Sequence, residues 1–231
     1  MRSHILAEIP DLSSDRLLPE AWLDYATAVQ RSNLPPGRPV HRTRRNAVDL
    51  GEGVGRDDTA TLVKDANAII DLVSGNSLLL SDAAAKVARL SRIWAVPAER
   101  ISYDGVGIGR DFANYLVKHG LRDCVRYVVA GRPREPKKRF TNLRTEAAWR
   151  LHDRLNADRH TDDSYPLSSR QPPFHIRARK WWALLREDLE ALTYDLVGEK
   201  KVWLILKELL MIKLGRSPDR SDALCHSIYS W

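Results

Sequence analysis

The stretch YDGVGIGRDF, residues 103–112, closes an apolar run with Asp104 and then places glycine at every second position three times. A second stretch, VDLGEGVGRD at residues 48–57, repeats this pattern: Asp49 follows an apolar run, and G-x-G-x-G and Arg-Asp come after it. Glycine-rich segments between regular elements are typical of turns. Because an aspartate stands just before each glycine-rich turn, we interpret the two stretches as strand ends that share one site.

The segments around the VDLGEGVGRD stretch predict an antiparallel meander. Three runs rich in apolar and β-branched residues follow one another with short connections, at residues 45–50, 59–65 and 68–75. A helix is expected next at residues 82–96, with Ser81 as its N-cap and Pro97 as its terminator.

The YDGVGIGRDF stretch lies inside a predicted strand–helix–strand unit. Strands are expected at residues 100–104 and 124–131, with a helix between them at residues 110–120 that Gly120 closes. Two strands joined through a helix imply a parallel crossover. The sheet is therefore predicted to be mixed, with both antiparallel and parallel pairs.

The rest of the chain predicts further helices and one hairpin. Apolar residues recur four apart on one helical face at Leu143, Ala147, Leu151 and Leu155. The other expected elements are a helix at 185–192, a hairpin of strands 192–197 and 201–207, and a terminal helix starting at Ser217 and Pro218. The predicted fold class is α/β, with a central mixed sheet flanked by helices. Residues 1–40 are expected to form an arm with one helix that leads into a domain at residues 41–231.

The charge of the chain suits an acidic partner. It has 37 Lys and Arg against 30 Asp and Glu, a formal net charge of +7. The excess gathers at residues 41–45, 132–139 and 177–182, and such clusters favour DNA because each neutralised phosphate releases counterions. A solvated basic face beside loops is the open alternative. The candidate DNA-binding residues are Lys137, Lys138, Arg139, Arg177, Arg179 and Lys180.

No segment predicts a membrane span or an exported protein. The longest apolar stretch, residues 202–212, contains Lys207 and Glu208 and falls far short of the roughly 20 residues of a membrane helix. The N-terminal residues lack the apolar core of a secretory signal, and Cys124 and Cys225 have no metal-type spacing. We therefore expect a protein of the cytoplasm.

The two aspartates favour a divalent metal. Neither stretch fits the G-x-G-x-x-G or phosphate-loop pattern, and Asp49 or Asp104 would repel a phosphate unless a cation lay between them. Carboxylate oxygens are the ligands that Mg²⁺ and Mn²⁺ prefer, often together with substrate phosphate oxygens. The sequence therefore predicts a metal site at the two strand ends.

The terminal helix supplies candidates for a third acid. Asp219, Asp222 and His226 lie three and four residues apart, so they share a helix face. For Asp219 we favour complementation of the helix dipole in the first turn. We place Asp222 beyond the first turn, where the helix dipole stabilises a negative charge only slightly, and favour it as a metal ligand. For the lone His226 we favour a structural or solvent-facing role over ligation.

Five segments in order resemble the C-terminal nuclease domain of tailed-phage large terminase subunits, at residues 47–63, 100–116, 140–149, 185–192 and 213–224. Residues 4–22 are similar to the segment that leads into that domain. The resemblance implies an RNase H-like fold whose acids bind two divalent metal ions. It assigns the catalytic and metal-binding positions to Asp49, Asp104 and Asp222.

The resemblance also marks supporting residues, each with a structural alternative. Asp58 matches a further acid of the first motif, or only braces the loop. Asn142, Arg144 and Glu146 match an N-x-R-x-E segment that orders the site or the DNA, unless Arg144 and Glu146 form a buried network. Lys213 matches a basic position that neutralises a phosphate. The alternative is that its side chain extends along the helix end into water.

The resemblance implies an endodeoxyribonuclease that cuts concatemeric viral DNA during genome packaging, with little sequence specificity. Its implied partners are duplex DNA, a terminase ATPase domain, the small terminase subunit and the portal, in the bacterial host cytoplasm. This chain lacks the ATPase loop G-x-x-x-x-G-K-[ST], so we expect it not to translocate DNA alone. The alternatives are a non-catalytic DNA-clamping or portal-docking module and another RNase H-like nuclease, such as a junction resolvase.

Overall fold

The computed structural model describes residues 15–28, 43–51, 58–75, 79–134, 139–156, 174–176, 180–197 and 201–229. Within these residues, six strands form a mixed sheet in the order β6-β5-β2-β3-β4-β7, and three strands form a small second sheet in the order β1-β8-β9. The main sheet contains β2 (Arg45–Asp49), β3 (Thr59–Lys64), β4 (Ala68–Gly75), β5 (Ile101–Asp104), β6 (Val125–Tyr127) and β7 (His175–Ile176).

The pairing of the main sheet confirms the predicted meander and crossover. Strands β2, β3 and β4 pair antiparallel in sequence order. Strand β5 pairs parallel with β2, and β6 pairs parallel with β5. Helix α3 (Gly109–Lys118) connects β5 to β6. The parallel pairs place the carboxyl ends of β2 and β5 side by side.

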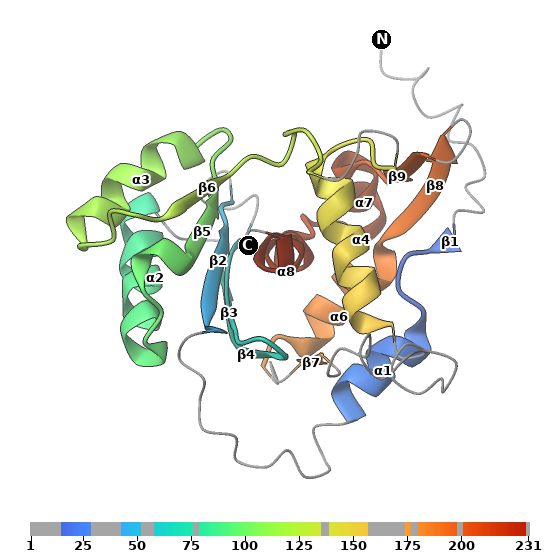
Figure 1. Cartoon of the computed structure of the whole chain (residues 1–231), viewed down its shortest axis with the longest axis horizontal. Coiled ribbons are helices and arrows are strands. Elements are labelled where there is room, and N and C mark those ends of the chain that lie inside the picture. The colour runs from blue at the N-terminus through green and yellow to red at the C-terminus, as the bar shows by residue number, and fades with distance from the viewer. Residues whose placement is uncertain are drawn as a thin grey trace.

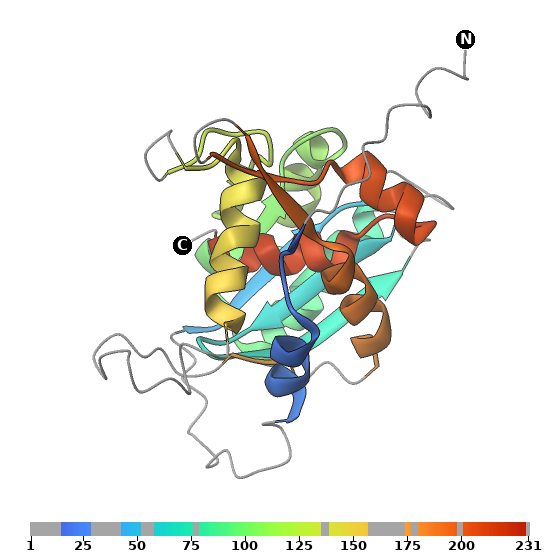
Figure 2. The same ribbon diagram turned by 90° about the vertical axis from the view of Figure 1, so that its right-hand side faces the viewer.

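Helices cover both faces of the main sheet (Figure 1). Helix α2 (Leu80–Trp94) and α3 cover one face, where the apolar side chains of Val48 and Val63 meet them. Helix α8 (Asp219–Tyr229) lies on the other face, across β2 and β3, as Figure 2 shows. Helices α4 (Leu143–Leu155) and α6 (Trp182–Ala191) lie outside α8. Helix α8 is therefore enclosed, although it carries several polar residues.

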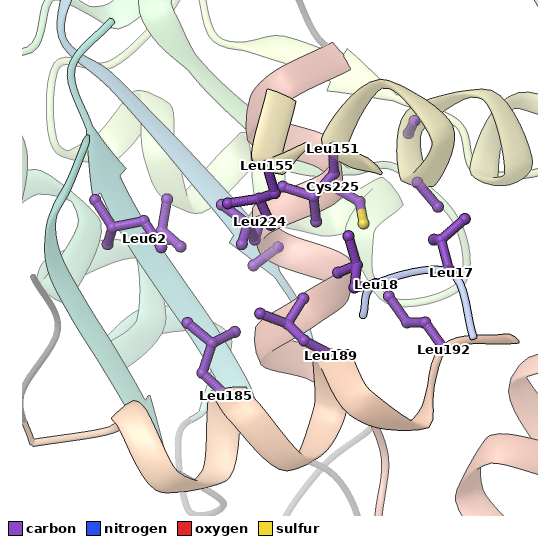
Figure 3. Packing of buried hydrophobic residues seen from close by; sticks show 14 of the residues in the cluster. Leu17, Leu18, Leu62, Leu151, Leu155, Leu185, Leu189, Leu192, Leu224 and Cys225 are labelled. Carbon is purple, nitrogen blue, oxygen red and sulfur yellow. The ribbon is translucent and has the colours of Figure 1, made fainter. Parts of the chain in front are cut away.

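The larger hydrophobic core lies between the sheet and these outer helices. Leu62 of β3, Leu151 of α4, Leu189 of α6 and Leu224 of α8 are all fully buried in it. Figure 3 shows their side chains converging from these separate elements. Each fully buried leucine side chain contributes about 1.5–3 kcal/mol relative to an exposed one, so this core fixes α8 against the sheet.

The segment near the N-terminus joins the same core. Leu17, Leu18 and Leu23 are buried there, the last within α1 (Glu20–Ala28). Strand β1 (Asp15–Arg16) pairs antiparallel with β8 (Thr193–Val197), which in turn pairs with β9 (Lys201–Leu204). The antiparallel pairing of β8 and β9 confirms the expected hairpin.

Several predicted element boundaries are wrong. The strand expected at residues 124–131 is β6, which covers only Val125–Tyr127. Helix α2 begins at Leu80, with Leu79 at the cap position and no side-chain cap bond, so Ser81 is not the N-cap. The helix extends this far because Leu80 packs against the core on that face. The strand expected at residues 201–207 ends at Leu204, and a further helix, α7 (Lys207–Leu214), follows it. A continuous apolar run does not distinguish strand from helix by period alone.

The alternating glycines of residues 105–109 have two separate structural causes. Gly107 adopts a left-handed backbone conformation, with φ of 55°, which glycine reaches without steric cost. At Gly109, a β-carbon would lie 1.9 Å from the carbonyl oxygen of Asp104. Only glycine permits the start of α3 to approach the end of β5 so closely.

In the part of the chain that the structure describes, no helix has both the length and the apolar character required to cross a membrane.

Candidate functional site

The two strand-end aspartates lie side by side. Asp49 is the last residue of β2 and Asp104 the last of β5. The parallel register pairs Ala47 with Ser102 and Val48 with Tyr103, so the next residues along the two strands are the two acids. Both side chains face α8, because successive residues of a strand alternate between faces and Val48 faces the opposite core. The backbone N–H of Val106 donates to Oδ1 of Asp104 at 3.1 Å and holds that carboxylate at the turn.

Helix α8 brings the third acid, Asp222, to the same place. Together the three acids line a small pocket with a volume of about 20 Å³. Our prediction that Asp222 lies beyond the first turn is wrong, because the helix starts at Asp219 and its first-turn acids include both residues. The pocket is lined by Asp49, Asp104, Tyr127, Val129, Arg144, Ala147, Asp222, Cys225 and His226.

Lys207, which the sequence interpretation did not select, lies at the centre of the acids. Its Nζ is 3.0 Å from Oδ2 of Asp222, 3.4 Å from Oδ1 of Asp219 and 3.6 Å from Oδ2 of Asp49. The sequence predicts one strand at residues 201–207, so it does not indicate that Lys207 begins a helix, as it does in α7. The sequence does carry a signal for it, since Lys207 and Glu208 interrupt an otherwise apolar run.

Burial and charge set the protonation of these groups. Burial raises the pKa of Asp49 well above its usual range, and Asp219, Asp222 and Asp104 raise it further against the opposing effect of Lys207. Burial likewise raises the pKa of Asp104. For Asp222, burial acts in the same direction, but Lys207 and then Arg144 outweigh it and lower the pKa. The site thus holds more acid groups than cations.

The donor set fits a hard divalent cation. Oδ2 of Asp49 is buried and accepts no hydrogen bond from the described residues, and its nearest cation, the ammonium of Lys207, stands 3.6 Å away. Within the described ranges, no three potential ligand side chains converge on one point as they would around an ion. Asp49, Asp219 and Asp222 are arranged around the ammonium group of Lys207 instead.

The N-x-R-x-E residues have three different roles. Asn142 caps α4, its Oδ1 accepting from the backbone N–H of Thr145 at 2.8 Å. Arg144 donates to Asp222 and lines the pocket. Glu146 points elsewhere and accepts from Arg150 and from the backbone N–H of Arg134. The alternative of an Arg144–Glu146 network is therefore wrong, because residues two apart on a helix lie on different sides.

Asp58 and Asp219 form a clasp between β3 and α8. The backbone N–H of Asp58 donates to Oδ2 of Asp219 at 2.9 Å. The carboxylate of Asp58 accepts from Ser74 at 2.9 Å and forms an ion pair with Arg220. Asp58 thus ties the start of β3 to β4 and α8, and the loop that it was expected to brace, residues 52–57, lies outside the described residues. Asp219 lies in the first turn of α8, where its charge complements the helix dipole, and it also contacts Lys207.

His226 and Tyr127 form the inner wall of the pocket. Their rings stack with centroids 4.2 Å apart. Burial lowers the pKa of His226 to about 3, so the imidazole is neutral near pH 7. Lys213 lies in the last turn of α7 with its side chain exposed, and it is not among the pocket-lining residues.

Two of the candidate DNA-binding residues can be placed. Arg139 lies over the rings of Phe140 and Trp149, and Lys180 lies over the ring of Trp181. Neither is among the described residues that line the pocket. Four others, Lys137, Lys138, Arg177 and Arg179, fall outside the described residues.

No protein-family model and no curated protein matches the chain. Solved structures do. The nuclease domain of the large terminase subunit gp2 of bacterial virus Sf6 superposes with a TM-score of 0.76 at 16% identity, covering 93% of this chain and 98% of that one. The large terminase nuclease from thermophilic phage G20c with bound magnesium gives a TM-score of 0.53 at 14% identity, covering 80% of each chain.

The large terminase of bacteriophage HK97 gives a TM-score of 0.54 at 12% identity, covering 95% of this chain but 44% of that one. The chain therefore has the fold of the nuclease domains of phage large terminases. The predicted RNase H-like architecture, a mixed sheet flanked by helices, is confirmed.

Proposed function

We propose that the chain is a divalent-metal-dependent endodeoxyribonuclease of the large-terminase type. The observation that carries this proposal is that Asp49, Asp104 and Asp222, which come from two parallel strand ends and one enclosed helix, line the same pocket. The shared fold supports it, as do the metals named for the relatives: magnesium for the G20c nuclease and manganese for a form of the Sf6 domain that superposes with a TM-score of 0.75.

The three carboxylates would hold two Mg²⁺ or Mn²⁺ ions at the scissile phosphate. When bound, such ions lower the pKa of a coordinated water and stabilise the leaving 3′-oxygen. The enzyme's own residues prepare this site: the backbone N–H of Val106 fixes Asp104, and Arg144 orients Asp222. Lys207 balances part of the acid charge, because its ammonium lies within 4 Å of carboxylate oxygens of two of the three acids.

In its biological setting, we propose that this domain cuts concatemeric viral DNA during packaging, in the host cytoplasm. Its partners would be a terminase ATPase domain, the small terminase subunit and the portal. The fold shared with terminase nucleases and the basic charge of the chain support this assignment.

Nicking of supercoiled plasmid tests the proposal directly. The chain is incubated with Mn²⁺, Mg²⁺ or EDTA, and products are separated on a gel. We expect conversion to nicked and linear forms at many positions with either metal, and none with EDTA. A four-way junction offered in competition distinguishes a resolvase, which would cut the junction first.

A non-catalytic DNA-clamping or docking module is the second candidate. The observation that favours it is the ion pairing of Lys207 with Asp222 and Asp49, which balances part of the acid charge without a metal. Titration calorimetry with Mn²⁺ separates the two: a folded chain that shifts DNA on a gel, binds no Mn²⁺ and cuts nothing is the module.

The basic loop at residues 132–139 gives a prediction about DNA binding. Replacing Lys137, Lys138 and Arg139 with Gln together is expected to reduce the slope of log affinity against log salt by up to about 0.9 per phosphate contact removed. The pattern of cut positions should stay the same, because phosphate contacts carry no sequence information. Fluorescence anisotropy with a labelled duplex at several salt concentrations measures the slope, and an unchanged slope would show that the loop does not touch DNA.

A further inference from the structure

Arg144 is tethered at two of its three guanidinium nitrogens. From α4, its Nε donates to Oδ1 of Asp222 at 3.4 Å, and its Nη1 donates to the backbone carbonyl of Ile205 at 2.7 Å. These two contacts hold the planar group between α8 and the segment that follows β9. The side chain is 12% exposed, and Arg144 lines the acid pocket.

The third nitrogen, Nη2 of Arg144, is buried and donates no hydrogen bond to the described residues. A buried donor left in this state costs about 1–3 kcal/mol, and more when the group is charged, so such a group calls for an explanation. Arg220 also has buried nitrogens without hydrogen bonds to the described residues, but it lies under the ring of Trp181 and does not line the pocket. Arg144, by contrast, is one of the residues that line the pocket where the acids meet.

A phosphate oxygen matches this nitrogen in charge and geometry. Guanidinium groups form strong, directional hydrogen bonds to phosphate. A donor whose position is fixed before the substrate binds does not have to reorient, at a cost in free energy, as charge develops on the reacting group. The tethers to Asp222 and Ile205 provide this fixation.

We infer that Arg144 donates through Nη2 to a non-bridging oxygen of the scissile phosphate, and so is a catalytic residue of the proposed nuclease, on which this inference rests. Arg144 forms and breaks no covalent bond. It holds the phosphate against the acids and stabilises the charge that its oxygens carry in the transition state.

Arg144 would then have two effects: it would contact the substrate, and through Nε it would orient Asp222. Measuring DNA affinity in the Asp222→Asn background separates them, because the Asp222 carboxylate is absent there and binding is measured without cleavage. A labelled duplex is titrated by anisotropy in EDTA with the Asp222→Asn chain, with and without Arg144→Gln. Arg150→Gln in the same background is the matched control, because Arg150 lies on the same helix but pairs with Glu146, away from the pocket.

We expect Arg144→Gln to weaken duplex binding about tenfold in both the wild-type and Asp222→Asn backgrounds, as for loss of a charged hydrogen bond. Arg150→Gln should change affinity less than about twofold. In single-turnover cleavage with Mn²⁺, Arg144→Lys should lower the rate about a hundredfold, because lysine keeps the charge but cannot hold all three contacts at once.

If Arg144→Gln leaves affinity unchanged in the Asp222→Asn background, the inference is overturned, and Arg144 is a positioning residue for Asp222. If the wild-type chain binds DNA but cuts nothing with any metal, the proposed nuclease activity fails while the affinity data still report the phosphate contact. If the wild-type chain binds no DNA, both the proposed function and this inference fall.

Discussion

Replacing Asp104 with Asn is expected to lower the cleavage rate of plasmid DNA by at least about a thousandfold. Asn keeps the shape of the side chain and its oxygen still accepts from the backbone N–H of Val106, but it removes the charge that holds a divalent ion. Metal ions supply several kcal/mol of transition-state stabilisation, and about 4 kcal/mol corresponds to a thousandfold in rate. Asp49→Asn should behave in the same way, because the two acids share one edge of the sheet.

DNA binding by Asp104→Asn should match or exceed that of the wild type, since one negative charge leaves the pocket. Calorimetry should show weakened Mn²⁺ binding. Asp111→Asn is the matched control: Asp111 is an exposed aspartate in the first turn of α3, and its loss should leave cleavage and metal binding unchanged. Cleavage at the wild-type rate by Asp104→Asn would refute the assignment of the catalytic acids.

Replacing Asp58 with Ala is expected to reduce the free energy of unfolding by about 3 kcal/mol, because loss of one member of a buried ion pair leaves the other uncompensated. The side chain of Arg220 is 3% exposed, its Nε and Nη1 make no hydrogen bond to the described residues, and Asp58 is the carboxylate that pairs with its Nη2. At about 2–4 °C for each kcal/mol in a domain of this size, the midpoint of thermal unfolding should fall by about 6–12 °C.

Two further variants isolate the ion pair. Ser74→Ala removes only the hydroxyl donor to the same carboxylate and should cost about 1 kcal/mol. The double variant Asp58→Ala, Arg220→Met should recover part of the loss, because no charge is then left buried alone. Urea unfolding followed by circular dichroism measures all four proteins. A loss for Asp58→Ala no larger than for Ser74→Ala would mean that the clasp does not stabilise α8.

Much of the secondary structure could be predicted because its signals are local. The meander follows from three apolar runs with short connections, and the crossover follows from a strand, a helix and a strand in sequence. Boundaries were less predictable where packing decides them. Helix α2 extends to Leu80 because this residue contacts the core. The start of α7 is not predicted because it lies in an apolar run that fits a strand equally well.

The candidate acids could also be selected from the sequence, because the same arrangement, an aspartate at the end of an apolar run followed by alternating glycines, occurs twice. Asp49 and Asp104 stand in such positions, and Asp222 was selected by its place on the last helix. The structure places all three at one pocket. Their catalytic role, and the division of the chain into an arm and a domain, stay predictions.

The sequence by itself determined the order of the elements and the glycines that let α3 begin against the end of β5, because these depend on backbone sterics and on residues near one another in the chain. It also placed an aspartate at the end of each of two strands. The tertiary structure alone decided which cations meet those acids. Lys207 and Arg144 come from α7 and α4, and Arg220 finds Asp58 162 residues away. Charge pairing across such distances leaves no period or spacing in the sequence, since it exists only after the cores on both sides of the sheet have fixed α8 in place.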